Sequence, residues 1–230
     1  MKTWKIVILS SLLVSGYAAA TNPGSYHHTT GVGLTEYPSL KDPNKPLIPQ
    51  PGEWDAAVHV YQSGNSNGSS VDQFQSKGSV VHVHQYGNNG GSTVNQAATK
   101  SLIKLDQHGS GNQSVAGQTG TENSIAITQS GGPNWSTANQ SGMDNAITVT
   151  QSGDNNGSNI TQSGKNSSVD VIQTGYRSGS TVNQYQTDGS MVLVKQSGGY
   201  NNSLVNQSYN NALTVVEQSG NSNWSNVNQH

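Results

Sequence analysis

The chain of 230 residues contains no cysteine, a single phenylalanine and few charged residues, which make up only 10% of the sequence. The absence of cysteine excludes a disulfide scaffold and cysteine-based zinc sites. A formal net charge of −2 offers no basic face of the kind that nucleic acids require, so we expect no nucleic-acid partner. Hydrophobic residues reach 30%, which is too little for an ordinary globular domain of this length.

Glycine, serine, asparagine and glutamine dominate the sequence instead. Low hydrophobicity without high net charge differs from the usual signature of disorder, and it matches the polar, Asn/Gln-rich compositions that form cross-β structure. The sequence contains no H-E-x-x-H motif, no phosphate-binding loop and no grouping of Ser, His and Asp. We therefore expect neither an enzyme nor a cofactor, and no catalytic or metal site.

The N-terminus has the features of a secretory signal peptide. Lys2 and Lys5 precede a short apolar run over 6–14, and Ala20 closes an A-x-A cleavage site, which predicts that residues 1–20 are removed. The protein is therefore expected to be secreted. Residues 21–51 are polar, rich in proline and without periodicity, and they are predicted to form a flexible N-terminal segment.

Glutamine recurs with a fixed period over the rest of the chain. The step is 11 residues everywhere except for two steps of 12, which end at Gln85 and Gln196 and share one local pattern (FQSKGSVVHVHQ and YQTDGSMVLVKQ). Periodicity of this kind is typical of repeat architectures in which successive units stack. Sixteen of the twenty glutamines lie on this series: Gln62, Gln73, Gln85, Gln96, Gln107, Gln118, Gln129, Gln140, Gln151, Gln162, Gln173, Gln184, Gln196, Gln207, Gln218 and Gln229.

Each 11-residue arm alternates with period 2, the signature of a strand. Arms rich in aliphatic residues alternate with more polar ones, so the unit is two arms, or 22–23 residues, and eight units fill 52–230. Positions two, four and six before each glutamine share its face, and none of the 64 positions on that face is charged. A charge-free face is what an interior requires, because an unpaired buried charge is costly.

Turns are expected after each glutamine, where glycine usually follows two residues later and supplies the positive φ of a tight reversal. The sequence thus predicts an all-β fold, a β-solenoid of stacked strand–turn–strand rungs that becomes cross-β amyloid on assembly. Eight rungs would give a column about 38 Å tall. In the last repeat Asn211 lies seven rather than six residues before its glutamine, which predicts that Leu213 and Val215 point outward.

The pattern resembles the curlin repeat, S-x5-Q-x-G-x2-N-x-A-x3-Q. Over 101–118 the chain places Ser101, Gln107, Gly109, Asn112 and Gln118 on this motif, with serine at 114 where the consensus has alanine. The resemblance extends over about 52–230. It implies a subunit that is exported through an outer-membrane channel and polymerises with itself into extracellular curli-like fibres on the bacterial surface, with roles in biofilm matrix and adhesion, and with a nucleator subunit as a further partner.

Three alternatives remain open at this point: a minor, nucleating curlin, a stable monomeric adhesin solenoid, and an ice-binding solenoid, which would require a regular outward column of threonine. His59 and His82 share one outward column, with His84 two residues along. They are either scattered surface histidines or a metal or pH-sensing site. Trp135 and Trp224 share another outward position, where they either pack fibres side by side or are isolated exposed aromatics.

Overall fold

The computed structural model describes residues 7–10 and 56–230, of which 7–10 are described by their backbone alone. Within these ranges every regular element is a strand, and none is a helix able to span a membrane. The strands are β1 (Val7–Ser10), β2 (Ala56–Ser63), β3 (Gly68–Gln73), β4 (Ser79–Asn88), β5 (Gly91–Thr99), β6 (Leu102–Ser110), β7 (Gln113–Thr121), β8 (Ser124–Gly131), β9 (Trp135–Met143), β10 (Ala146–Asp154), β11 (Gly157–Lys165), β12 (Ser168–Tyr176), β13 (Gly179–Asp188), β14 (Met191–Gly199), β15 (Asn202–Gln207), β16 (Leu213–Asn221) and β17 (Trp224–Gln229).

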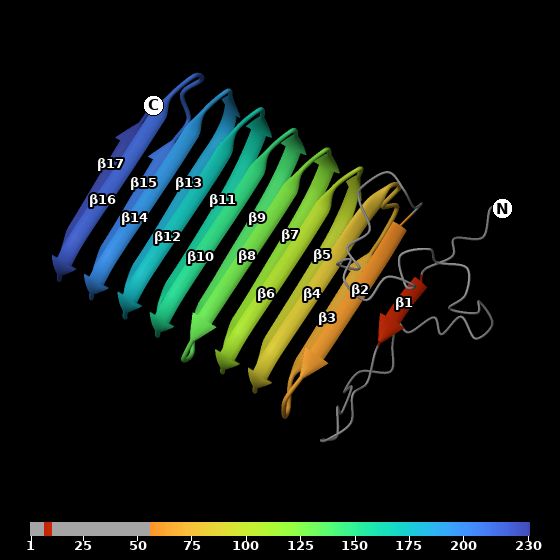
Figure 1. Cartoon of the computed structure of the whole chain (residues 1–230). Helices are drawn as coiled ribbons and strands as arrows, with labels where there is room; N and C mark the ends of the chain where they lie inside the picture. The colour runs from red at the N-terminus through yellow and green to blue at the C-terminus, as the bar shows by residue number, and fades with distance from the viewer. Residues whose placement is uncertain (1–6, 11–55) are drawn as a thin grey trace, which may run out of the picture.

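The strands form two parallel sheets that face each other as the walls of a column (Figure 1). One sheet, the nine-stranded sheet, runs β1-β2-β4-β6-β8-β10-β12-β14-β16, and the other, the eight-stranded sheet, runs from β3 to β17 through the odd-numbered strands. Each consecutive pair of strands from β2 onward is one rung, so the chain climbs the column once in every 22 or 23 residues. The predicted β-solenoid of about eight turns is confirmed.

The core lies between the two sheets, which contribute different numbers of buried aliphatic residues to it. Most strands of the nine-stranded sheet contribute two buried aliphatic residues, as Ile147 and Val149 do from β10, whereas a strand of the other sheet contributes one, as Ile160 does from β11. Serine fills the second inward position of the eight-stranded sheet, with Ser136 and Ser158 joined by a 2.9 Å hydrogen bond. No Asp, Glu, Lys or Arg is buried among the described residues, as the charge-free face predicted.

Glycine stacks upon glycine where the nine-stranded sheet turns into the next arm. Gly131, Gly153 and Gly175 have φ near +100° to +125°, and a Cβ on Gly153 would lie 1.9 Å from the carbonyl oxygen of Gly175. The backbone therefore needs glycine here for two reasons, the left-handed conformation and the close approach of successive rungs.

The two 12-residue steps are accommodated after Gln73, between β3 and β4, and after Gln184, near the end of β13. Gln75 and Gln186 have φ of 51° and 52° at these points. The register between β11 and β13 shifts only beyond Gln162 and Gln184, and the paired glutamines stay aligned. Since a bulge absorbs one extra residue without displacing the rest of the strand, the irregular steps leave the rungs in register.

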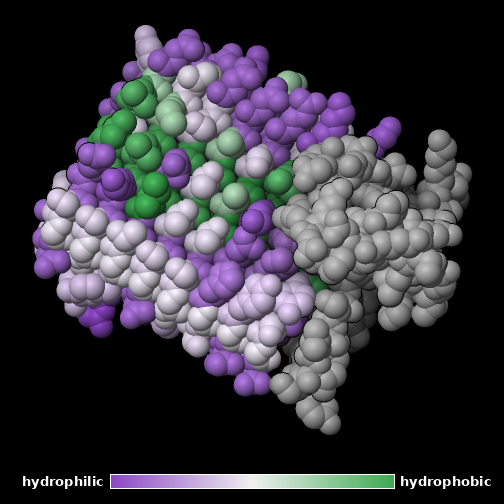
Figure 2. Space-filling view, in the orientation of Figure 1, coloured by the Kyte–Doolittle hydropathy of each residue, from purple (hydrophilic) through white to green (hydrophobic). Residues whose placement is uncertain are grey.

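The last repeat has the orientation that its sequence predicts. Leu213 and Val215 point outward and are 60% and 51% exposed, while Thr214 and Val216 are buried between the walls. Met191, paired with Leu213 on the neighbouring strand, is exposed as well. Figure 2 shows hydrophobic side chains gathered toward the C-terminal end of the column, on a surface that is otherwise mostly neutral or polar.

Candidate functional site: glutamine ladders and the open ends of the column

Two glutamine ladders run the length of the column, one on each sheet. In the middle of the nine-stranded sheet, Nε2 of Gln129 donates to Oε1 of Gln151 at 2.8 Å, and Gln151 donates in turn to Gln173 at 2.8 Å. Each of the sixteen predicted glutamines takes part in such a bond to its neighbour on the next rung, at distances of 2.5–3.0 Å. An amide that both donates and accepts along the stack is the pairing expected for identical stacked residues.

The glutamines of the nine-stranded sheet also bind the facing wall, a contact that sequence reasoning missed. Gln151 Nε2 donates to the carbonyl oxygen of Trp135 at 3.1 Å, and Gln173 Nε2 to that of Gly157 at 2.9 Å. Both amide hydrogens of each such glutamine are therefore used, one along the ladder and one across the core. These glutamines hold the two sheets together as well as holding the rungs together.

A second polar column lies in the turns, at the asparagine six residues before a ladder glutamine. Asn145 Nδ2 donates to the carbonyl oxygens of Ser141 and Gly164, and Asn145 Oδ1 accepts from the backbone N–H of Ser167 on the next rung. The side chain thus satisfies backbone groups that a tight turn leaves without ladder partners. The asparagine of the repeat motif is the sequence signal for this column.

The hydrogen bonds of both ladders all point the same way, from Nε2 toward the C-terminal rung. Consequently the first rung is left with acceptors, and Gln73 Oε1 is buried without a hydrogen-bond partner among the described residues. At the other end Gln229 accepts from Gln207 and Thr214, and within the described chain its Nε2 has no partner. The two ends of the column are therefore complementary in hydrogen bonding.

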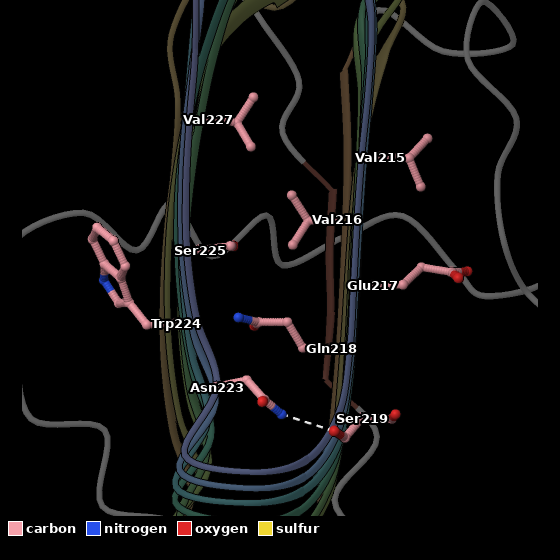
Figure 3. Close-up of a pocket in the computed structure, with 9 residues that line it drawn as sticks. All are labelled: Val215, Val216, Glu217, Gln218, Ser219, Asn223, Trp224, Ser225 and Val227. Atoms are coloured by element: carbon pink, nitrogen blue, oxygen red, sulfur yellow. Dashed lines mark hydrogen bonds between the residues drawn. The ribbon is translucent and has the colours of Figure 1, made fainter.

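The ends also expose interior side chains that the middle rungs bury. Val227 and Gln229 on β17 are only half-buried, whereas the corresponding Val182 and Gln184 on β13 are fully buried. Figure 3 shows the C-terminal end along the column: Val216, Gln218, Ser225 and Val227 point into the space between the walls, and Val215 and Trp224 point away from it. Among the described strands, β16 and β17 each have a neighbour on one side only, so their outer backbone edges are open.

The N-terminal end differs between the two sheets. Among the described residues no strand pairs with the outer edge of β3, but β2 is paired in parallel with β1, with Ile8 opposite Val58 and Ser10 opposite Val60. β1 falls within residues 1–20, the segment predicted to be removed on export. The edge of β2 is thus covered by a parallel strand from outside the repeats.

The family model of the curlin associated repeat matches residues 100–131, 120–153 and 142–175, with each match spanning a rung and part of the next. Residues 100–175 are therefore repeats of the curlin family. The matched segments cover β6 to β12, and the same strand register and glutamine ladder continue through the rungs on either side. No curated protein matches the sequence. Curlin repeats and this β-solenoid are structural rather than enzymatic.

The structure brings the three outward histidines together and buries one of them. His82 was expected at the surface, but its side chain is 1% exposed, because the rings of His59 and His84 lie against it at centroid distances of 4.8 and 3.9 Å. Trp135 and Trp224 are 50% and 68% exposed on separate strands of the eight-stranded sheet. Trp135 lies over Gly157 of the next rung, where only a glycine leaves room for the indole.

Replacing Gln151 by leucine is expected to destabilise the column. The substitution removes the bonds to Gln129, Gln173 and Trp135, and each buried group left without a partner costs about 1–3 kcal/mol. Assembled protein carrying Gln151→Leu should dissolve at a lower concentration of guanidinium. Gln113→Leu is the matched control, because the Gln113 side chain is exposed on β7. Equal resistance of both variants would contradict a stabilising role for the ladder.

Proposed function

We propose that the chain is a secreted structural subunit that assembles with itself into extracellular, curli-like amyloid fibres, which contribute to biofilm matrix and surface adhesion. The observation that carries the proposal is the unfinished stacking at the C-terminal end. There β16 and β17 present open backbone edges, half-buried core side chains and the last members of two ladders. Soluble proteins generally protect such edges, since they recruit other strands.

The direction of the ladders supports head-to-tail growth. The donors of Gln218 and Gln229 would meet the acceptors of Gln62 and Gln73 on the next subunit, which continues both ladders without reversal. The contact joins two different surfaces of one chain, and a heterologous contact that does not close into a ring generates a filament. Because every rung is parallel and in register, the junction would repeat the spacing of about 4.8 Å found between strands.

The curlin repeats over residues 100–175 support secretion, since curlin family proteins are subunits of extracellular fibres. The export channel in the outer membrane and a nucleator subunit are the partners proposed on the same basis. Nothing in the chain's charge favours a nucleic-acid partner. The open ends favour a polymer over a stable monomeric adhesin, because a monomer would leave both edges exposed.

The proposal is tested by assembly of the purified exported chain at micromolar concentration. We expect a lag phase that preformed fibres abolish, binding of amyloid dyes, and fibre diffraction with a meridional reflection at about 4.8 Å. A chain that stays monomeric for days and fails to respond to seeds would overturn the proposal. In cells, deletion of a major subunit should remove all fibres, whereas deletion of a nucleator should leave other subunits secreted but unpolymerised.

Retention of residues 1–20 is expected to slow assembly. The backbone of Val7–Ser10 pairs with β2, so a chain that keeps this segment has its first edge occupied. We expect seeded elongation of a chain starting at Thr21 to be at least several-fold faster than that of the chain with residues 1–20, measured by dye binding. Elongation at the same rate for both would show that the edge of β2 is not used in assembly.

A further inference from the structure

Three histidines form a cluster on the outer face of the first two rungs. His59 on β2 is directly opposite His82 on β4, and His84 follows two residues later on the same strand, so that all three share one face. The rings of His59 and His82 stack with an interplanar angle of 8°, and the ring of His82 lies 3.9 Å from that of His84. One imidazole nitrogen from each residue lies within 4.8 Å of the other two.

This spacing is close to what a metal ion requires. Zinc binds imidazole nitrogens at about 2.0–2.1 Å, which places the nitrogens of a tetrahedral site about 3.4 Å apart. Rotation of the side chains about χ1 and χ2 can bring the three rings to that separation, because the strands already hold their Cα atoms on neighbouring positions of one sheet. Three histidines leave a fourth position open to water or to another ligand.

Two of the ring nitrogens are buried without a hydrogen-bond partner. Within the described chain, Nδ1 of His59 and Nδ1 of His82 are shielded from solvent and bonded to nothing, although His82 is almost fully buried. A buried polar atom without a partner is costly, and coordination of a metal ion would satisfy it. Burial lowers the pKa of all three histidines, that of His82 to about 3, so the rings are neutral and able to bind metal near neutral pH.

The charges around the cluster balance one another. Asp106 on β6 lies 3.6 Å from Nδ1 of His84, where it can orient that ring as carboxylates do beside metal-bound histidines. Lys104, next to His82 on the same outer column, would repel a cation, but its ammonium lies 2.7 Å from the Asp106 carboxylate. Tyr61 and Tyr86 flank His84, with their rings at 5.6 and 5.9 Å from its ring.

We propose that His59, His82 and His84 form a binding site for one borderline divalent transition-metal ion, with zinc as the ion to test first. Imidazole is a preferred ligand of zinc and copper, and a set of three nitrogens without thiolates favours such ions over calcium or magnesium. The ion would join β2 to β4, which are 23 residues apart in the chain, and would hold the first two rungs together at the N-terminal end of the column. Metal that binds only the folded state stabilises it.

Fibres grown from the purified exported chain, stripped of metal with a chelator, would be dialysed against Zn²⁺. We expect one zinc per chain, and X-ray absorption at the zinc edge should count three imidazole nitrogens. His59→Gln, His82→Gln and His84→Gln should each weaken binding at least about 100-fold, since loss of even an outer-shell partner typically costs 10–100-fold. The absorption measurement needs no substitution, so it stands even where His82→Gln prevents folding.

The control variants use three histidines outside the cluster. His108→Gln, whose ring stacks on Tyr86 outside the cluster, and the double variant His27→Gln/His28→Gln should bind zinc as tightly as the unsubstituted chain. Absence of binding, fewer than three imidazoles around the zinc, full affinity in His59→Gln or His84→Gln, or loss of binding in a control variant would each overturn the proposal. Because the fibres are formed before metal is added, a negative result here would leave fibre assembly itself unaffected.

Discussion

Substitution of Gly153 by alanine is expected to abolish fibre formation. Gly153 has φ of +98°, which costs an alanine about 1–2 kcal/mol. A Cβ there would also lie 1.9 Å from the carbonyl oxygen of Gly175, so the two rungs must separate and lose backbone hydrogen bonds of about 0.5–1.5 kcal/mol each. The strain is repeated in every subunit of a fibre. Dye binding and electron microscopy of the purified variant would measure the loss.

Gly68→Ala is the matched control for this prediction. Gly68 begins β3, has no positive φ, and a Cβ added to it would meet no atom within 4 Å. We expect this variant to assemble at the rate of the unsubstituted chain, with a small gain or loss from the lower flexibility of alanine. If Gly153→Ala also assembled normally, the close stacking of the glycine column would not be the packing in the fibre.

An aspartate in place of Val227 is expected to stop fibre growth, because every head-to-tail junction contains β17 of one subunit. Val227 lies between the walls on the last strand and is half-buried, so a single folded subunit can keep the new carboxylate hydrated. Docking of a second subunit on β17 would bury that charge without a partner, which costs several kcal/mol. Elongation from preformed seeds should therefore fall at least about 100-fold, as measured by dye binding.

Val215→Asp is the control, since Val215 lies at the same end on β16, the last strand of the other sheet, but points outward and is 51% exposed. It should elongate normally, because its charge stays in solvent after docking. Head-to-tail assembly predicts one further property of Val227→Asp. Its N-terminal end is intact, so small amounts of the variant should add to growing fibres of the unsubstituted chain and then block that end.

Two outcomes would contradict this account of the ends. Normal elongation of Val227→Asp would mean that β17 is not a growth surface. Equal inhibition by Val215→Asp would mean that the outer face, where Leu213 and Met191 are also exposed, takes part in assembly. Either result would redirect the search for the interface from the open edges to the sides of the column.

The two ends of the column carry different features, so we expect assembly to be controlled differently at each end. The first rungs carry the histidine cluster and, before cleavage, pair with β1. The last rungs carry an exposed apolar pair, Leu213 and Val215. A metal ion joining β2 to β4 would strengthen the surface that receives the next subunit. Control of assembly is therefore expected at the N-terminal end.

The sequence by itself determined the strands, their faces and the order of the rungs. Period 2 assigned each side chain to the interior or the surface, which correctly placed Leu213 and Val215 outside, and the 11-residue glutamine period predicted stacking. These features depend on local geometry: a strand alternates its faces, and a glycine such as Gly153 permits the turn that returns the chain to the same height in the column.

The tertiary structure alone decided how the two walls contact each other and where exposure departs from the pattern. The bond from Gln151 to the Trp135 carbonyl depends on the distance between sheets, which no period encodes. His82 is buried although it lies on an outward column, because burial depends on which neighbouring rings cover it. Likewise, the common direction of the ladders, which makes the two ends complementary, arises only when all rungs are stacked.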